Sequence, residues 1–401
     1  MDKVINSILT LKRYCEKEQY KGWDVGDGIE SPLLTNTFFG NIPFVRFVAQ
    51  QLTGHRIGYI NVRPLLRVPK LVNAKGIALF LNGYCNLYDI LKSANYVIPG
   101  YSYQECMTKI ESLAELLISL RSKANYSSGW GYPIGWQGRL NFFFPPNAPT
   151  VVASSFAVDA LSHAYELTGN SLYKEQILET ANFILKDLHK TPYKNGFIFS
   201  YSQFKGNDTV YNASLLGARV LLQCFKYSGN EEYKHIAKLA INTCIDAQNP
   251  DGSWAYGNGT TQSWIDNFHT GYNLEAIQAY HDITGEYLYD QVLEKGVSFW
   301  INNHFNLNHV PKYFHDKQYP IDIHCCGEIF VVLHKLGLYS EYKKLADDVF
   351  RWTIENMQDK KGYFYFQKHW LLTNKTPYMR WSNAFMFNAL SCLLKDKLNL
   401  R

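Results

Sequence analysis

The sequence predicts an all-α fold, an (α/α)6 toroid in which six helical hairpins form an inner and an outer ring. A fixed order of elements repeats: a helix of small apolar residues ends at a glycine, an amphipathic helix follows, and a glycine beside an aromatic comes next. The helix-ending glycines recur at intervals of 60, 56 and 52 residues: Gly169, Gly229, Gly285 and Gly337. Such spacing is typical of repeat architectures, in which each hairpin needs its neighbours to bury its faces.

Two kinds of helix alternate along the chain. Segment 150–168 is small and apolar on nearly every face, which predicts burial all round, whereas 173–188 carries one apolar stripe and charged residues elsewhere. The first kind forms the predicted inner ring: 76–91, 150–168, 210–227, 270–284, 323–336 and 381–394. The second kind forms the predicted outer ring: 103–121, 173–188, 231–248, 287–303 and 341–357.

The missing sixth outer helix is expected at the N-terminus, over 3–18, where it would pair with the last inner helix. One toroid domain then spans 1–401. Segment 31–72 fits no hairpin, since it holds four prolines among hydrophobic and basic residues. We interpret it as an insertion that covers one side of the toroid, because loops of this length usually have a function or pack as a unit.

Composition narrows the class of protein. The net charge of +5 is small for 401 residues and no long Lys/Arg run occurs, which excludes nucleic acid as a partner. We find no signal-peptide-like apolar run and no transmembrane segment. The eight cysteines are scattered without a Cys-x-x-Cys pair, so we expect reduced thiols, a cytoplasmic location and no cofactor.

Aromatic turns precede several inner helices and predict short turns and strands at one end of the toroid. There the long outer-to-inner connections gather, and helix N-termini favour anionic groups. We expect the substrate at this mouth, with these binding residues from successive connections: Trp130, Tyr132, Trp136, Tyr211, Asn212, Trp264, Tyr272, Asp322, Tyr378, Arg380 and Trp381. Arg139 belongs to the same connections. Exposed tryptophans and tyrosines would stack on sugars, although aromatics also pack as ordinary core.

The first candidate catalytic cluster precedes the fourth inner helix. Asp266 comes just before the helix, and His269 and Tyr272 are three residues apart on one face. An acid, an imidazole and a phenol within one turn could transfer protons. The alternative is that Asp266 only caps the helix.

The second candidate cluster is Asp322, His324 and Glu328. Glu328 follows His324 by four residues, so both could face the lumen, and burial would suit Glu328 as a general acid. Cys325 and Cys326 are adjacent and point to different faces, so they favour buried thiols over zinc. We predict no metal.

Two acids and one arginine come from the ends of the chain. Asp24 and Asp27 follow the first helix and could supply a second carboxylate opposite Asp266, Asp322 or Glu328. Arg380 precedes the last inner helix and suits either a substrate carboxylate or a salt bridge that closes the ring.

At this point the chain resembles a known group of proteins. Its hairpins and aromatic turns are similar to those of six-hairpin glycosidases, polysaccharide lyases and the helical domains of uronyl C5-epimerases and N-acylglucosamine epimerases. More closely, the following motifs resemble bacterial proteins encoded in capsule and exopolysaccharide biosynthesis clusters: Gly22-Trp23-Asp24, Asn61-Val62-Arg63-Pro64-Leu65-Leu66, Asn267-Phe268-His269-Thr270-Gly271, Asp322-Ile323-His324 and Pro377-Tyr378-Met379-Arg380-Trp381-Ser382-Asn383-Ala384-Phe385-Met386. The resemblance implies a role near surface polysaccharides, with association with polysaccharide-assembly enzymes.

Several functions fit these residues. A carbohydrate-active enzyme with glycoside-hydrolase-like chemistry is favoured, because carboxylates recur in three connections and a hydrolase needs two across the sugar. A uronate lyase or C5-epimerase would use a His or Tyr base, with Arg380 neutralising the carboxylate. A terpenoid cyclase or prenyltransferase would exploit the aromatic residues, but the sequence lacks the Asp-rich motifs of those enzymes. A non-catalytic glycan-binding or scaffold protein is the fourth alternative.

Overall fold

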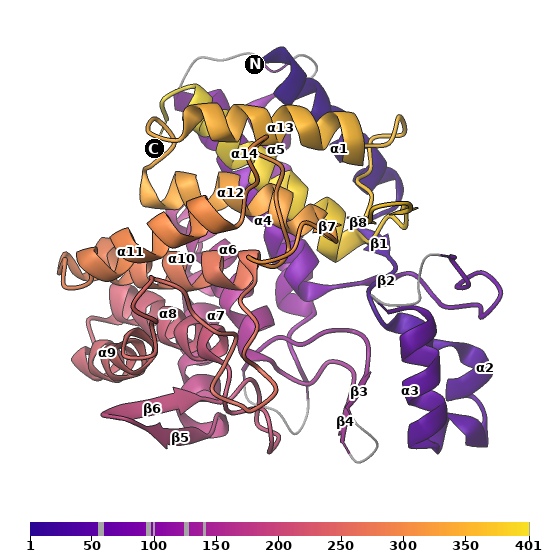
Figure 1. Cartoon of the computed structure of the whole chain (residues 1–401), viewed down its shortest axis with the longest axis horizontal. Helices are drawn as coiled ribbons and strands as arrows, with labels where there is room; N and C mark the ends of the chain where they lie inside the picture. The colour runs from indigo at the N-terminus through magenta and orange to yellow at the C-terminus, as the bar shows by residue number, and fades with distance from the viewer. Residues whose placement is uncertain (55–59, 94–97, 99–100, 124–127, 139–141, 401) are drawn as a thin grey trace.

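In a computed structural model of the chain, the six inner helices form a closed ring, as the sequence predicts (Figure 1). The structure describes residues 1–54, 60–93, 98, 101–123, 128–138 and 142–400. Each inner helix packs on the next, and the last packs on the first. The ring consists of α4 (Ala74–Ser93), α6 (Val151–Thr168), α8 (Tyr211–Ser228), α10 (Asn267–Thr284), α12 (Ile323–Leu336) and α14 (Phe385–Lys397).

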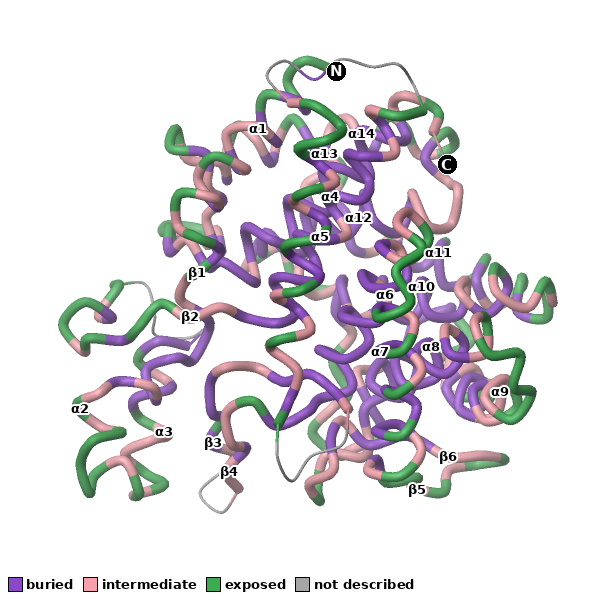
Figure 2. The backbone as a smooth tube through the Cα atoms, turned by 180° about the vertical axis from the view of Figure 1, so that it is seen from behind, coloured by how far each residue is buried: buried purple, intermediate pink, exposed green. Residues whose placement is uncertain are grey.

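Six outer helices surround this ring. The N-terminal helix packs against α14 and completes the sixth hairpin, so the two ends of the chain meet. The outer helices are α1 (Asp2–Lys17), α5 (Tyr103–Ser119), α7 (Ser171–Asn182), α9 (Glu231–Ile245), α11 (Asp290–Asn303) and α13 (Lys343–Met357). Figure 2 shows that burial is concentrated in the inner helices and that the outer helices alternate between buried and exposed positions, as two distinct helix types require.

The helix ends follow their sequence signals. Gly169, Gly229, Gly285 and Gly337 all adopt the left-handed conformation, with φ between 68° and 70°, which costs a glycine no steric strain. At the other end of the inner helices, Thr150, Asp266 and Asp322 accept a backbone N–H of the first turn. Two predicted helices contain a π-helical turn. The predicted helix 173–188 ends as an α-helix at Asn182 and continues as a π-helical turn over Phe183–Asp187. The predicted helix 381–394 begins as a π-helical turn over Met379–Ala384, and α14 starts only at Phe385.

Short antiparallel strands connect the segments that meet at the mouth. The pairs are β1 (Lys21–Gly22) with β2 (Leu71–Val72), β3 (Trp136–Gln137) with β4 (Phe143–Phe144), β5 (Lys190–Tyr193) with β6 (Gly196–Phe199), and β7 (Ile321–Asp322) with β8 (Gln367–Lys368) and β9 (Thr373–Asn374). Pairing of Lys21 with Val72 and of Gly22 with Leu71 brings together the two ends of the segment that leaves the toroid.

The described residues of the segment 31–72 form a small projection, and we call this segment the lobe. It contains α2 (Pro32–Thr35), a 3-10 turn η2 (Phe38–Asn41) and α3 (Pro43–Leu52), and α2 and α3 lie to one side of the helical rings (Figure 1). Helix α3 packs against a 3-10 turn η1 (Asp27–Glu30) and against β3. The lobe therefore adjoins the mouth.

All eight cysteines are buried free thiols. Among the described residues, the helices are too short or too polar to cross a membrane.

Gly271 of α10 is required by close packing inside the ring. A Cβ at this position would lie 2.1 Å from Oε1 of Glu328 on α12, whereas a Cβ at Gly76 of α4 would meet its nearest neighbours at 3.5 Å. We expect Gly271→Ala to lower the free energy of unfolding by about 1–3 kcal/mol through overpacking. Gly76→Ala is the matched control and should be neutral or stabilising by up to about 1 kcal/mol. Equal urea denaturation midpoints for both variants would contradict this packing.

The burial of His304, which follows α11, leads us to expect that the protein loses stability in acid. His304 is fully buried, neither ring nitrogen finds a partner in the described part of the chain, and burial lowers its pKa to about 3. The unfolded chain binds a proton near pH 6.5, so the contribution of neutral His304 to stability is complete above that pH and is lost as pH falls toward 3. Between pH 7 and pH 4 the wild type should lose about 3 kcal/mol more than His304→Phe. Urea titrations at several pH values test this, and parallel losses in both proteins would refute it.

Candidate active site

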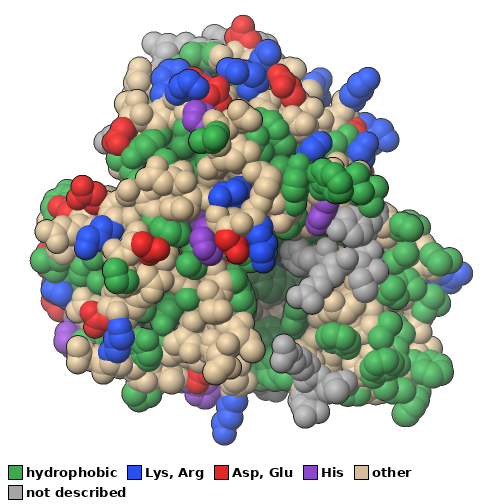
Figure 3. Space-filling view, viewed as in Figure 1, with side chains coloured by type: hydrophobic (Ala, Val, Ile, Leu, Met, Phe, Trp, Pro, Cys, Tyr) green, Lys and Arg blue, Asp and Glu red, His purple; other side chains and the backbone are tan. Residues whose placement is uncertain are grey.

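A cleft opens at the N-terminal ends of the inner helices. Its volume is about 500 Å³, within the usual range for a small-molecule site, and Figure 3 shows a hollow with hydrophobic side chains in it on this face. Aromatic rings form much of its wall and a few polar groups lie among them: Tyr132, Trp136, Phe142, Phe144, Thr150, Tyr201, Asn207, Tyr256, Gln262, Arg380 and Trp381. This mixture suits a saccharide, whose ring faces stack and whose hydroxyls form hydrogen bonds.

Arg380 sits between two aromatic rings of the cleft. Its guanidinium lies 5.0 Å from the centroid of Tyr132 and 5.2 Å from that of Trp381, both within cation–π range. The hydroxyls of Tyr132 and Tyr201 are hydrogen-bonded, and burial raises the pKa of each phenol. Two phenols and a guanidinium edge therefore supply hydrogen-bond donors to whatever fills the cleft.

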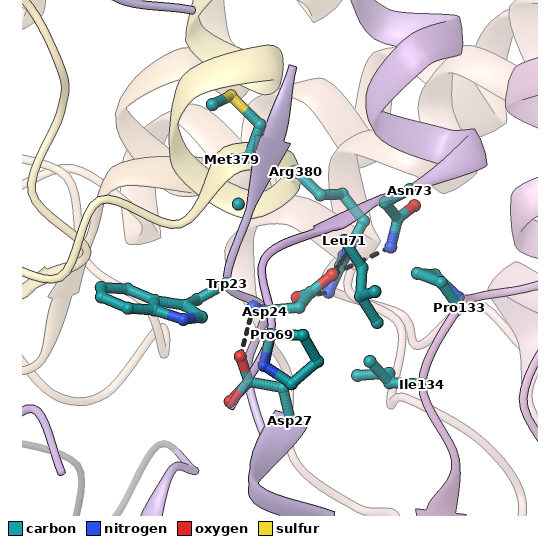
Figure 4. A pocket seen from close by; sticks show the side chains of 11 residues that line it. Trp23, Asp24, Asp27, Pro69, Leu71, Asn73, Pro133, Ile134, Met379 and Arg380 are labelled. Carbon is teal, nitrogen blue, oxygen red and sulfur yellow. Dashed lines mark hydrogen bonds and ion pairs between the residues drawn. The ribbon is translucent and has the colours of Figure 1, made fainter. Parts of the chain in front are cut away.

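The position of Arg380 is fixed by Asp24, which is buried with it. Nε and Nη2 of Arg380 donate to the two carboxylate oxygens of Asp24 at 2.7 and 2.5 Å. Asn73, just before α4, donates to the same carboxylate at 2.9 Å. Figure 4 shows Asp24 held between these two side chains. Asp24 and Arg380 thus form the ring-closing salt bridge that was one of the two roles expected for Arg380. Asp24 does not line the cleft.

Asp27 belongs to a second buried ion pair. Nε of Arg63 donates to Asp27 at 2.7 Å, and Nη2 donates to the Tyr378 hydroxyl at 2.8 Å and to the Thr53 carbonyl at 2.7 Å. Burial raises the pKa of Asp27 to about 7, although Arg63 acts in the opposite direction. This cluster joins the lobe to the last connection of the toroid, and it places Asp27 and Tyr378 away from the cleft wall.

Asp266 and His269 form a dyad at the edge of the cleft. Oδ1 of Asp266 caps α10 by accepting the His269 N–H at 3.0 Å, while Oδ2 lies 2.7 Å from Nδ1 of His269. One carboxylate therefore caps the helix, as the alternative predicted, and also orients the imidazole. A carboxylate on Nδ1 fixes that nitrogen as the donor and leaves Nε2 with the lone pair.

His269 contacts one residue of the cleft wall, although it is not itself among the residues that line the cleft. Its side chain is 22% exposed, and its ring lies 4.8 Å, edge to face, from Tyr256 of the cleft wall. No hydrogen bond involves Nε2 within the described ranges. Trp264 stacks on Tyr256 at 4.5 Å and donates to Asp266 at 3.1 Å, so it supports the dyad from outside.

A hydrogen-bonded chain lies beneath the cleft floor. The Tyr272 hydroxyl is 2.6 Å from Nε2 of His324 and accepts a hydrogen bond from Lys75 at 3.1 Å. Burial lowers the pKa of His324 and of Lys75 well below their usual ranges. His324 stacks on Phe385 at 3.6 Å and is covered by Phe268 and Trp381 at 4.8 and 5.1 Å. These three groups are therefore sealed from solvent.

Deeper in the lumen, Glu328 lies beside Glu275. Burial and the neighbouring carboxylate raise the pKa of Glu328 well above its usual range, so it carries a proton. Glu275 accepts a hydrogen bond from Lys335 at 2.7 Å and pairs with Arg219 at 3.4 Å, which in turn donates to Asp159 at 2.9 Å. This network reaches a second hollow of about 280 Å³ at the opposite end of the ring. Polar side chains thus fill the lumen between its two mouths.

Asp322 holds the connection before α12. Its carboxylate accepts the His324 N–H at 2.8 Å, the Trp381 indole at 2.8 Å and the Gln367 amide at 2.6 Å. Burial raises the pKa of Asp322 to about 6, although these three hydrogen bonds act to lower it. Asp322 is therefore a positioning group for Trp381 rather than a group that faces the cleft.

Some predicted binding residues lie outside the cleft. Trp130 is fully buried, and its indole donates to the Leu117 carbonyl at 2.7 Å, so it packs the loop layer. The Tyr211 hydroxyl pairs with that of Tyr193 at 3.3 Å, and Asn212 is buried beside it in α8. Arg139 lies outside the described residues. Tyr132, Trp136, Arg380 and Trp381 do line the cleft.

Other cleft residues carried no sequence signal that singled them out. Tyr201, Tyr256, Phe142 and Phe144 come from three different connections. Lys75, which lies beneath the cleft floor, precedes the predicted start of the first inner helix. The one sequence feature that could have singled out Lys75 is a lysine at the start of a helix of otherwise small and apolar residues. Within the described ranges, no group of three His, Cys, Asp or Glu side chains could hold a metal ion.

Comparison with known proteins agrees with this fold. No family model and no curated protein matches the chain. Among solved structures it is similar to a sugar epimerase from a ruminal bacterium, with a TM-score of 0.60, 16% identity and coverage of 82% of this chain and 88% of that one. It is also similar to a D-mannose isomerase, with a TM-score of 0.56, 14% identity and coverage of 81% and 87%. An unsaturated glucuronyl hydrolase specific for heparin gives a TM-score of 0.55, 14% identity and coverage of 82% and 88%.

The chain therefore shares the (α/α)6 toroid of the six-hairpin glycosidases and sugar epimerases. Because these proteins are named for several different reactions, the shared fold alone does not indicate which reaction this chain would catalyse.

The buried Arg380–Asp24 pair gives a stability prediction. Asp24→Ala leaves Arg380 buried without its anion, and we expect the free energy of unfolding to fall by about 3–5 kcal/mol. Asp24→Ala/Arg380→Met should recover part of this loss because the unpaired charge is removed. Glu166→Ala, which breaks an exposed pair with Lys226, should cost less than about 1 kcal/mol. Urea denaturation compares the three variants, and an unchanged midpoint for Asp24→Ala would show that the pair contributes nothing.

Proposed function

We propose that this protein is a carbohydrate-active enzyme that moves a proton between neighbouring carbons of an uncharged reducing sugar, an aldose–ketose isomerisation. The observation that carries the proposal is the Asp266–His269 dyad, with the imidazole partly exposed beside an aromatic cleft. The names of the similar structures, a sugar epimerase and a D-mannose isomerase, are consistent with it.

The dyad suits a general base. In the open-chain sugar, the lone pair on Nε2 of His269 takes the proton from the carbon next to the carbonyl, and the electrons of that C–H bond form the C=C bond of an enediolate. A proton then passes from the hydroxyl of that carbon to the former carbonyl oxygen. The imidazolium so formed keeps its Nδ1–H on Asp266, which stabilises the charge. The same proton then returns to the adjacent carbon, so one base on one face completes the isomerisation.

The polar groups of the cleft suit the other half of the reaction. Negative charge develops on the carbonyl oxygen as the proton leaves, and donors directed at that oxygen lower the barrier. Arg380 has one terminal nitrogen, Nη1, that is not engaged by Asp24. The Tyr132 ring lies 5.0 Å from its guanidinium, and Tyr201 lines the same cleft. These three groups are the donors we assign to the sugar oxygens.

Hydrolysis is less well supported than the sequence suggested. A glycosidase needs two carboxyl groups facing the scissile bond. Asp24 and Asp27 are held in buried ion pairs, Asp322 accepts three hydrogen bonds, and Glu328 lies under the floor. Asp266 alone is close to the cleft, and it is bonded to His269.

A uronate substrate is also less well supported. An arginine binds a carboxylate best through two parallel N–H groups, and Asp24 already occupies that edge of Arg380. Epimerisation, lyase chemistry and glycan binding remain alternatives to isomerisation of a neutral sugar. Terpenoid cyclisation has no acidic metal-binding group to support it among the described residues. Capsule or exopolysaccharide biosynthesis and a cytoplasmic location stay predictions.

Solvent deuterium exchange tests the proposed reaction. The full chain is incubated in D₂O with a panel of neutral reducing mono- and disaccharides, and NMR follows deuterium at the carbon next to the carbonyl together with appearance of the ketose. We expect turnover with partial exchange in the wild type. His269→Gln should lower kcat by about 10²–10⁴-fold, because it removes the base and keeps a polar side chain of similar size.

A second histidine provides the matched control. His163 lies 3.2 Å from Asp89 and lines the opposite hollow, so His163→Gln should leave turnover unchanged. Release of new reducing ends without exchange would replace this proposal with hydrolysis. An unsaturated product from uronate oligosaccharides would replace it with a lyase.

A further inference from the structure

The lobe has an unusual composition. Residues 31–72 contain no Asp or Glu, although the chain has 35 acidic residues in all. They contain five basic residues, which equals the net charge of +5 of the entire chain: Arg46, Arg56, Arg63, Arg67 and Lys70. Arg63 is buried in an ion pair with Asp27 and Lys70 pairs with Glu18, so among the described residues the cations of the lobe that have no acidic partner are Arg46 and Arg67.

The same segment exposes large hydrophobic side chains. Phe38, Phe39 and Phe44 are 76%, 58% and 63% exposed, and Leu33 is 48% exposed. Figure 3 shows hydrophobic side chains covering the region of the lobe, at the lower right. Scattered exposed hydrophobic residues are ordinary, but a contiguous group of this kind usually marks an interaction surface.

The two short helices of the lobe arrange these side chains on one surface. Phe44, Val48 and Leu52 follow one another at intervals of four along α3 and are all exposed, so they form one stripe. Ala49 and Gln50 are buried, on the side of α3 that packs against η1 and β3. Turn η2, which carries Phe38 and Phe39, packs against α3. The apolar stripe therefore faces away from the toroid.

We propose that the lobe is a docking surface for an anionic lipid membrane, into which Phe38, Phe39 and Phe44 insert. Apolar side chains beside cations, without acids, are the features of segments that lie in the membrane interface. Arg67 is exposed in the lobe, and Arg46, two residues after Phe44 in α3, is half-buried. A second copy of this chain fits the lobe less well, because contact between two lobes would bring together two surfaces of the same charge.

Docking would hold the cleft near the lipid surface. Gln50 of α3 donates to the Gln137 carbonyl at 3.2 Å and accepts the Gln137 N–H at 2.7 Å. Trp136, the neighbour of Gln137 in β3, lines the cleft. The lobe and one wall of the cleft are thus joined by direct hydrogen bonds, whatever reaction the cleft performs.

Vesicle flotation tests the inference with the full chain. The protein is mixed with vesicles of phosphatidylcholine alone or with added phosphatidylglycerol, and the floated fraction is measured at low and at high salt. We expect binding to the anionic vesicles that is at least tenfold tighter than to neutral vesicles and that weakens as salt rises. Phe38→Ser/Phe39→Ser/Phe44→Ser should reduce it at least tenfold, and Arg67→Glu should reduce it by a smaller factor.

An equally exposed apolar group elsewhere gives the matched control. Tyr287, Leu288 and Leu307 are 67%, 55% and 101% exposed on other connections, and changing all three to serine should leave flotation unchanged. Absence of flotation in the wild type, or equal flotation of the lobe variant, would overturn the proposal. A wild-type dimer in sedimentation that the lobe variant converts to a monomer would also overturn it, in favour of a second copy.

Discussion

The buried pair of Arg380 and Asp24 is the contact on which the mouth of the toroid depends. Asp24 follows the first helix, Asn73 precedes the first inner helix, and Arg380 precedes the last, so one carboxylate connects three segments from both ends of the chain. Charges removed from water to this degree are stable only with their partners in place. The ring closes, and one wall of the cleft is set, because this pair forms.

The other acids near the mouth have similar structural tasks. Asp27 anchors Arg63, and Asp322 holds Trp381 and caps α12. Asp266 is the exception because it caps α10 and also contacts an imidazole that reaches the cleft edge. Although carboxylates recur in the connections at this mouth, a histidine, and not a pair of carboxylates, is thus the titratable group best placed for chemistry.

The fold was predictable from sequence because burial in a double ring is periodic and is recorded in each helix. The Asp266–His269 contact was also predictable, since capping places residues three apart together. Tyr201 and Tyr256 were not, because the wall they form brings together connections that are distant in the chain, and neither was the contact of Lys75 with Tyr272 beneath the floor. Trp130 and Tyr378 were predicted to bind substrate but lie outside the cleft. The Trp130 indole donates to the Leu117 carbonyl and the Tyr378 hydroxyl accepts from Arg63, and sequence spacing cannot reveal such partners.

The filled lumen determines how a substrate can travel. His324, Tyr272, Lys75, Glu328 and Glu275 occupy the axis between the two hollows of the ring, so the cleft is a blind pocket and not a tunnel. A long glycan could not thread through the protein. Whatever enters the cleft must leave through the same opening, so a second molecule cannot take its place until the first has departed.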